Sequence, residues 1–351
     1  MDFGLITEGN TRHGAVTTQQ RFREIVDAAV LADKWGFNVF GAGEQHFVEP
    51  LCTISAGEMV LAAISTATKN IRLRTTILVL PFHHPISVAE RIASLDVLSG
   101  GRVEVGTGKG NNAIAAEAFG IALAEADIRW KESMEIMLCA WGNERFSYDG
   151  SIFRIPERRL APNVLQRPHP PLWCAAVSPA AHEFVGKIGF GVLSLTVSVT
   201  LQQLEKRIAV YRKGIAEAEP IGKFVNDRVS VFCQLHCADT VELACEQAKG
   251  PMLEYMSEAV DLYAQITERQ GKQVDFSKIR ETISDFDHCN RSDMILVGDP
   301  DLIIKKIQRY EAIGVDEMLI RLDGIPHEDA MHSIELIGKH VIPEFRRKKA
   351  A

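Results

Sequence analysis

The sequence predicts an α/β fold, namely a (β/α)8 TIM barrel with inserted loops, and three observations lead to this prediction. Along the 351 residues, eight short apolar segments alternate with segments of helical periodicity. The apolar segments are almost continuous runs, as expected for parallel strands that are buried on both faces. The chain is 46% hydrophobic, which is enough for one large core. A doubly wound sheet is the alternative, but it usually has fewer strands and an early glycine-rich turn.

The predicted strands are residues 3–7, 38–43, 71–80, 103–106, 172–177, 191–197, 229–237 and 318–322. The predicted helices are residues 17–35, 55–68, 85–98, 128–141, 179–187, 200–217, 239–268, 300–313 and 328–342. Helix starts carry their own signals. Thr17 or Thr18 can cap the first helix. Ser55 and Glu58 have the spacing of a capping box at the second helix.

Two segments depart from this repeat. Residues 146–171 are rich in Pro, Arg and Tyr without helical periodicity, and residues 268–291 are polar and weakly patterned. Long irregular segments in a compact domain are usually functional lids or mobile insertions. We therefore expect one domain over residues 1–351, with an irregular insertion at 146–171 and a mobile lid at 268–291.

Composition narrows the function classes. The net charge is −7 with both signs interspersed, apart from a basic run at 346–349, so a nucleic-acid partner is not expected. The seven cysteines include no C-x-x-C pair, which indicates reduced core residues of a cytoplasmic protein. No leader-like amino terminus and no apolar run of membrane-spanning length is present, so we expect neither a signal peptide nor a membrane span. His83 and His84 are adjacent, which is poor geometry for a metal, and no metal site is predicted.

Three polar residues follow the second predicted strand directly. Residues 39–47 read Val-Phe-Gly-Ala-Gly-Glu-Gln-His-Phe, so the strand ends in Glu44, Gln45 and His46. Polar side chains at the carboxyl ends of parallel strands line the pocket of α/β enzymes. A capped strand followed by a solvated turn is the alternative interpretation. We predict that these three residues are catalytic.

Two further strand ends are suited to binding an anion. Residues 106–112 read Gly-Thr-Gly-Lys-Gly-Asn-Asn, in which glycines expose backbone N–H groups and Lys109 adds a positive charge. A Rossmann fingerprint would need glycine where Asn111 stands. Ser178 precedes Pro179 at a helix start, where N–H groups point outward. A plain glycine-rich turn and a plain helix cap are the alternatives.

A series of short segments matches one known family, namely residues 33–37, 42–47, 79–81, 84–86, 89–102, 106–110, 166–171, 237–240 and 296–300. Through them, and along nearly its whole length, the chain resembles the bacterial luciferase-like, flavin-dependent monooxygenases, particularly the diketocamphane and limonene monooxygenase type. The resemblance implies a TIM barrel that takes reduced FMN from a separate NAD(P)H:flavin reductase. O2 would then form a flavin C4a-hydroperoxide that oxygenates a small, apolar organic substrate.

The resemblance also assigns residues. It implies that Lys109 and Ser178 hold the FMN phosphate, that a cis peptide joins Thr76 and Ile77 under the flavin ring, and that His46 acts as an acid or donor near it. The cofactor-binding residues so predicted are Thr76, Ile77, Gly108, Lys109, Gly110, Asn111, Ala176, Val177 and Ser178. A homodimer formed through the early helices is also implied.

Two positions differ from the luciferases. Gln45 stands where a luciferase has a histidine, and Gly108 stands where it has a reactive cysteine. Light emission is therefore not expected. Two alternatives remain open, namely an F420-dependent oxidoreductase that transfers hydride without O2, and a non-catalytic flavin-binding subunit.

Overall fold

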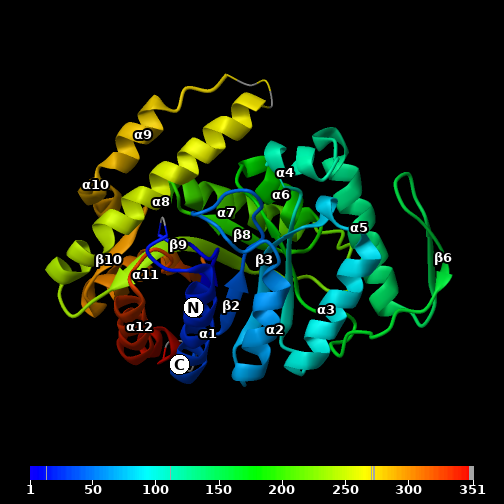
Figure 1. Ribbon diagram of the computed structural model, residues 1–351, viewed down its shortest axis with the longest axis horizontal. Coiled ribbons are helices and arrows are strands. Elements are labelled where there is room, and N and C mark those ends of the chain that lie inside the picture. The colour runs from blue at the N-terminus through cyan, green and yellow to red at the C-terminus, as the bar shows by residue number, and fades with distance from the viewer. Residues whose placement is uncertain (13, 111, 270, 272, 348–351) are drawn as a thin grey trace.

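Eight parallel strands close into a barrel that helices surround, in a computed structural model that describes residues 1–12, 14–110, 112–269, 271 and 273–347 (Figure 1). In order around the barrel, the strands are β1 (Asp2–Thr7), β2 (Val39–Ala42), β3 (Arg72–Val79), β4 (Val103–Gly108), β7 (Leu172–Ala175), β8 (Gly191–Leu195), β9 (Val229–Cys237) and β11 (Glu317–Arg321). Pairing of β9 with both β8 and β11, and of β11 with β1, closes the ring. The predicted TIM barrel and all eight of its strands are confirmed.

The helices of the described chain are α1 (Thr18–Trp35), α2 (Gly57–Ala67), α3 (Pro85–Ser99), α4 (Ala113–Ala118), α5 (Ala126–Gly142), α6 (Pro179–Lys187), α7 (Leu201–Ala216), α8 (Val241–Arg269), α9 (Ser277–Ser284), α10 (Phe286–Arg291), α11 (Pro300–Ala312), α12 (His327–Leu336) and α13 (Ile342–Arg347). The Thr17 side chain caps α1 by accepting from the Gln20 N–H at 3.1 Å, as predicted. The capping box predicted at the second helix is wrong. Ala56 is the N-cap of α2 and makes no side-chain cap bond, and Glu58 instead accepts from Arg91 at 3.0 Å.

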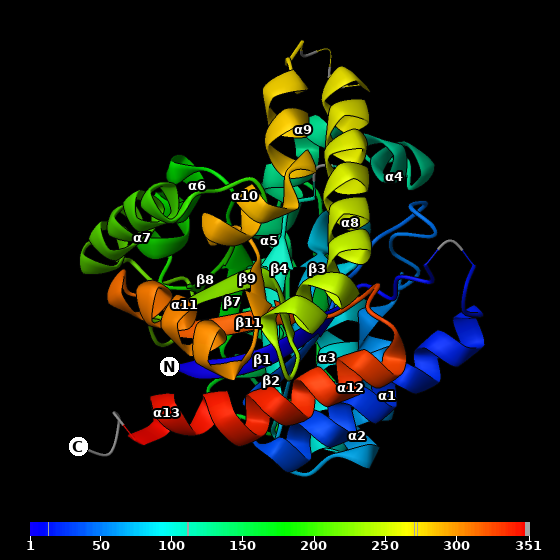
Figure 2. The ribbon, with the colours of Figure 1, turned by 90° about the vertical axis from the view of Figure 1, so that its left-hand side faces the viewer.

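Several short elements were not predicted, because segments of three to six residues carry too little pattern. Besides α4, they include β10 (Leu296–Gly298), which extends the sheet beside the end of β9. In the segment 146–171, β5 (Phe146–Asp149) and β6 (Arg154–Arg158) form a hairpin. In the segment 268–291, α9 packs against α8, and the two project beyond the strands (Figure 2). That segment is therefore more helical than its weak pattern predicts.

Side chains fill the amino-terminal half of the barrel. Arg74 is fully buried, with Nε 2.7 Å from Glu104 and Nη1 2.6 Å from Glu317, and its guanidinium lies 3.9 Å from the centre of the Trp173 ring. An apolar layer lies above it, formed by Ile6, Val39 and Leu319 with Phe232. A buried cation paired on two sides and an apolar layer leave no room for a ligand here. Access is therefore from the carboxyl ends of the strands.

The opening at the carboxyl ends lies over one side of the barrel. Apart from two residues at the amino ends of strands, the partly exposed residues of the eight barrel strands are Thr76, Ile77, Ala175, Leu195 and Phe232. Leu195 and Phe232 are neighbours in the pairing of β8 with β9. Tyr255 of α8 packs with Leu51 and Cys52 over the rest of the mouth. The accessible surface is thus mostly apolar and faces β3, β7, β8 and β9.

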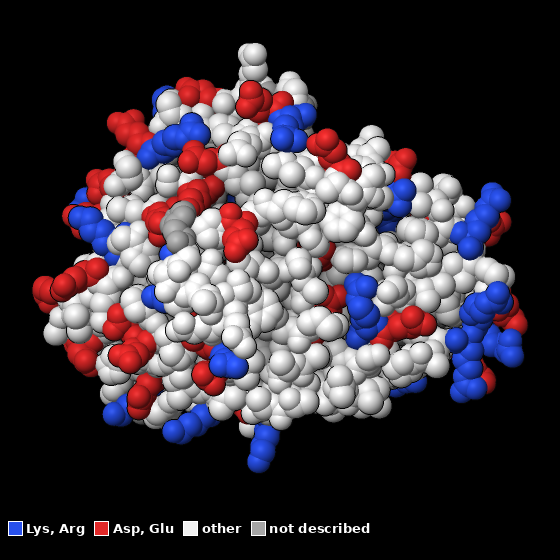
Figure 3. Space-filling view, in the orientation of Figure 1, with Lys and Arg blue, Asp and Glu red and all other residues white. Residues whose placement is uncertain are grey.

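The distribution of charges on the surface and the state of the cysteines can be compared with what the composition predicts. Acidic and basic side chains are intermixed over the face in Figure 3, whose central part carries few charges. All seven cysteines are free. Among the described residues, no helix is long and apolar enough to cross a membrane.

Candidate active site

Glu44 is the centre of a polar cluster at the barrel mouth. It is 5% exposed, and its Oε2 accepts from the backbone N–H of Val79 at 2.8 Å. Its Oε1 lies 2.9 Å from Nε2 of His46 and 2.8 Å from Nε2 of His83. The structure therefore brings Glu44 and His46 together, as the strand-end argument predicted. It adds His83, which sequence reasoning considered only as a metal ligand.

The contacts of Glu44 fix its charge. Burial raises the pKa of the carboxyl group, but hydrogen bonds from His46, from His83 and from the Val79 N–H outweigh it and lower the pKa below the ordinary value. Glu44 is therefore an anion near neutral pH and can only accept hydrogen bonds. It follows that both imidazoles donate from Nε2, so Nδ1 is the nitrogen of each ring that does not face Glu44.

His46 lies in an aromatic setting. Its ring meets Phe119 edge to face, with centroids 4.8 Å apart, and Phe119 stacks on Phe82 at 5.2 Å. The His46 carbonyl accepts from the Asn112 side chain at 3.3 Å, which ties the site to the start of α4. Apolar rings around an imidazole reduce its contact with water while the carboxylate holds its orientation.

Gln45 lies apart from this cluster. Its backbone N–H donates to the Ile54 carbonyl at 3.0 Å, whereas the partners of Glu44 among the described residues are His46, His83 and the Val79 N–H. Nothing in the geometry supports the catalytic function predicted for Gln45, which stays a prediction.

The ends of β3 and β4 interlock next to Glu44. The peptide bond between Thr76 and Ile77 is cis, as predicted, and both residues are partly exposed. A Cβ on Gly108 would lie 1.9 Å from Cδ1 of Ile77. A side chain at position 108, such as the cysteine of luciferases, therefore requires the end of the Ile77 side chain to move. Gly110 has a φ of +70°, the left-handed region that favours glycine. Asn111 lies outside the described residues.

The two predicted phosphate-binding segments come together. Lys109 lies 4.6 Å from the ring centre of Phe184 in α6, the helix that Ser178 caps by accepting from the Ala181 N–H at 3.2 Å. The Lys109 Nζ pairs with Asp127 at 2.6 Å on the surface. Lys109 therefore lies beside α6, and a cation near a helix with an open N-terminus is suited to an anion.

Not every backbone N–H group before α6 is free to donate to a phosphate. The Ala176 N–H donates to the Leu193 carbonyl at 3.0 Å, so it is already used within the sheet and cannot serve the phosphate. Val177 is 47% exposed. Of the backbone groups predicted for the cofactor, those of Val177 and Ser178 remain open to a ligand.

His182 fixes the start of α6 from inside the protein. It is fully buried, its Nδ1 lies 2.8 Å from the Ser178 carbonyl and its Nε2 lies 3.0 Å from the Ser194 hydroxyl. Burial lowers the pKa of His182 to about 4. The ring is therefore neutral, with Nδ1–H donating to Ser178 and Nε2 accepting from Ser194. Sequence reasoning missed this residue, because one histidine inside a helix carries no signal.

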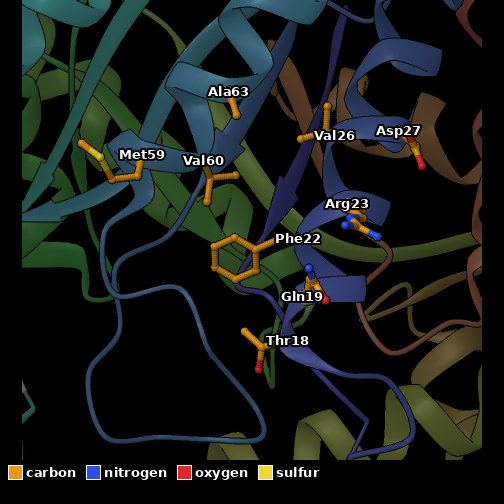
Figure 4. Close-up of a pocket in the computed structure, with 9 residues that line it drawn as sticks. All are labelled: Thr18, Gln19, Phe22, Arg23, Val26, Asp27, Met59, Val60 and Ala63. Atoms are coloured by element: carbon orange, nitrogen blue, oxygen red, sulfur yellow. The ribbon is translucent and has the colours of Figure 1, made fainter.

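Other hollows lie away from the mouth. A groove of about 620 Å³ runs between α1 and α2, where Phe22, Val26, Met59 and Val60 line it with polar residues at its rim (Figure 4). The groove is on the outside of the barrel, and Glu44 is not among the residues that line it. Within the described ranges, no group of three or more His, Cys, Asp or Glu residues could hold a metal ion.

Comparison with known proteins agrees with this geometry. Residues 1–317 match the model of the luciferase-like monooxygenase family, so the chain belongs to that family. The oxygenase component of the flavin-dependent trigonelline monooxygenase of Acinetobacter baylyi is 25% identical, over 99% of this chain and 97% of its own length. The predicted enzyme class, a flavin-dependent monooxygenase, is thereby confirmed at the level of the family.

Two further relatives show the range of cofactors in this fold. The oxygenating constituent of 3,6-diketocamphane monooxygenase from Pseudomonas putida, solved in complex with FMN, aligns with a TM-score of 0.80 and 24% identity, covering 98% of each chain. An F420-dependent glucose-6-phosphate dehydrogenase of Microbacterium testaceum is 23% identical over 97% of this chain and 98% of its own length. Proteins similar to this chain therefore include both an FMN-bound and an F420-dependent enzyme.

Proposed function

We propose that the protein is an oxygenase that uses reduced FMN and O2 to oxygenate a small, apolar organic molecule. The observation that carries the proposal is the Glu44–His46 pair, which lies at the same barrel mouth as a cation and the N-terminus of α6. The partly exposed Leu195 and Phe232 supply an apolar wall for the substrate. Phe82 and Phe119, stacked beside His46, add further apolar surface.

The residues present fit FMN. Ile77 and Ala175 are partly exposed and apolar, which suits the ring system of a flavin. Lys109 and the N–H groups at Val177 and Ser178 would hold the phosphate, with Lys109 released from its exposed pair with Asp127. Lysine keeps the charge of the arginine common in the family but not its two-pronged geometry. When bound, reduced FMN supplies the electrons that activate O2.

The chain's own residues then control protons and water. Nδ1 of His46 can donate or accept one proton, and the anionic Glu44 stabilises the protonated ring from the other side. Phe82 and Phe119 limit the approach of water to that atom. We also propose that the segment 268–291 acts as a lid, since α9 lies beyond the strands beside α8; residues 270 and 272 lie outside the described residues.

Partners follow from the same proposal. A relative is described as an oxygenase component, which supports a separate NAD(P)H:flavin reductase as the source of reduced FMN. We propose a homodimer, in which the apolar groove between α1 and α2 lies in the interface. The non-catalytic subunit is less well supported, because Glu44, His46 and His83 form a fully connected cluster.

Titration of the purified chain under anaerobic conditions with oxidised FMN, reduced FMN and F420, followed by O2, tests the proposal. We expect tightest binding of reduced FMN, and oxidation of the bound flavin at a rate different from that of free flavin. Failure to bind reduced FMN would rule out the proposed function. Binding of F420 with no reaction of the reduced cofactor with O2 would establish the hydride-transfer alternative.

A further inference from the structure

A second histidine shares the oxygen that orients His46. Nε2 of His83 and Nε2 of His46 both lie within 2.9 Å of Oε1 of Glu44. Two imidazoles on one carboxylate oxygen would ordinarily compete for the stabilisation that the negative charge offers. Whether they compete here depends on what lies behind His83.

Arg91 lies behind His83. Its Nη2 is 3.4 Å from Nδ1 of His83, on the far side of the ring from Glu44. Its Nε donates to Glu58 at 3.0 Å and its Nη1 donates to Ser87 at 3.2 Å, so the guanidinium is anchored on two sides. Glu58 is 5% exposed and belongs to α2, whereas Arg91 and Ser87 belong to α3. The packing of two helices therefore fixes the position of the charge beside His83.

An arginine side chain has donors only, so Nδ1 of His83 must accept. The hydrogen of a neutral His83 is then on Nε2, where Glu44 takes it. A second proton would have to go on Nδ1, directly facing an N–H of Arg91 and a full positive charge. Nδ1 of His46 has no hydrogen-bond partner and no cation against it among the described residues, so a proton can be added there.

We propose that Arg91 is a positioning residue that keeps His83 as the neutral Nε2–H tautomer, so that the charge of Glu44 serves protonation of His46 alone. The groups facing the two rings are Glu44, Arg91 and, behind Arg91, Glu58; His84 packs on Phe153 instead. Nδ1 of His46 gains a proton from a donor in the mouth and returns it, while His83 stays unchanged. Only the effect on catalysis rests on the proposed function; the tautomer of His83 does not.

Nitrogen-15 NMR of the histidine side chains in the chain without cofactor tests this directly, because two-bond couplings separate the two neutral tautomers from the charged ring. A His83→Asn variant assigns the His83 signals. In the unmodified protein we expect the neutral His83 ring to show the Nε2–H pattern. An Nδ1–H pattern for His83 would overturn the proposal.

Variants at Arg91 separate charge from hydrogen bonding. Arg91→Met removes both, and we expect charging of His83 at higher pH than in the unmodified protein, because Glu44 still accepts from Nε2 while no cation then faces Nδ1. Arg91→Gln keeps an N–H donor, so the tautomer should be retained while protonation of His83 becomes easier. Arg145→Met is the matched control, since Arg145 forms an exposed ion pair with Glu157 on the β5–β6 hairpin. If Arg91→Met does not fold, Arg91→Gln carries the test, and an unchanged His83 titration in it would contradict the proposal.

Discussion

At the scale of single residues, contacts rather than composition set the chemistry of the site. Glu44 is buried, yet three N–H donors keep it charged. The charge in turn fixes Nε2 of His46 as the nitrogen that carries the hydrogen toward Glu44. At Gly108 the important property is size, since a side chain there would occupy the position of Cδ1 of Ile77. Glu44 thus acts through its charge, whereas Gly108 acts through the absence of a side chain.

Glu44→Gln should lower the free energy of unfolding at pH 7 by about 1–3 kcal/mol, because a neutral amide cannot accept fully from three donors. The pKa of Glu44 is lowered in the folded protein, so this stabilisation is present above its ordinary value of 4.5 and is lost as the pH falls through the folded value. Urea unfolding at pH 7 and at pH 3 measures the difference. Gln45→Ala is the control and should change stability by less than about 0.5 kcal/mol. Equal effects of the two variants at pH 7 would contradict this account of Glu44.

Gly108→Ala should destabilise the protein by about 1 kcal/mol, at the lower end of the cost of overpacking, because the new Cβ would displace Cδ1 at the end of the partly exposed Ile77 side chain. Thermal unfolding followed by circular dichroism measures the change. Gly250→Ala is the matched control. No atom lies within 4 Å of a Cβ at that position in α8, so alanine should be neutral or stabilising by up to about 1 kcal/mol. A stable Gly108→Ala protein would show that Ile77 can move aside.

At the scale of elements, buried polar side chains hold the loops of the mouth in place. His182 links the start of α6 to β8 through Ser178 and Ser194. Asp323 links the end of β11 to that of β1 by accepting from the Thr7 hydroxyl at 2.8 Å and the Glu8 N–H at 2.7 Å. Each such contact joins segments that the barrel topology brings together.

The stability of the protein should fall as the pH drops from 6.5 toward 4. The folded pKa of His182 is about 4, against 6.5 when exposed, so the unfolded chain binds the extra proton between these values and stability rises with pH across that window. His182 alone contributes about 3 kcal/mol to this change. Burial also lowers the pKa of His169 and His236, so these two residues also make the protein less stable as the pH falls. Denaturant unfolding between pH 4 and pH 7 should show a smaller slope in His182→Gln, and an unchanged slope would contradict the assignment.

At the scale of the whole molecule, the barrel separates stability from chemistry. The amino-terminal half is packed around the Arg74 cluster, and the carboxyl ends carry the ionised Glu44, Lys109 and the N-terminus of α6. Early helices on the outside leave an apolar groove that plays no part at the mouth (Figure 4). A groove of this kind suits contact with a second copy of the chain.

Sedimentation equilibrium should therefore give twice the mass of one chain. Met59 is 59% exposed in the groove, and Met59→Glu should shift the equilibrium toward monomer by placing a charge in the interface. Leu165→Glu is the control, because Leu165 is 54% exposed but lies in the insertion at 146–171. A monomeric unmodified protein, or equal dissociation by both variants, would contradict the proposed dimer.

The sequence predicts the barrel well because its signals are local. Continuous apolar runs specify strands that are buried on both faces, and capping residues such as Thr17 and Thr200 specify helix starts. Glu44 and His46 could be predicted as site residues because they follow a strand directly, and parallel strands end at one edge. The resemblance to a family added the cis peptide at Thr76, which the structure bears out.

Only the tertiary structure decided which polar residues meet. The pair Ser55 and Glu58 has the spacing of a capping box, yet Glu58 binds Arg91, which is 33 residues away along the chain. In the sequence, His83 is one of two adjacent histidines. In the structure it contacts Glu44, because β2 and β3 are neighbours in the barrel. Apolar periodicity is a property of consecutive residues, so the sequence alone determined the elements. A hydrogen bond between distant residues depends on how those elements pack, so the charge and tautomers of the site were decided by the fold.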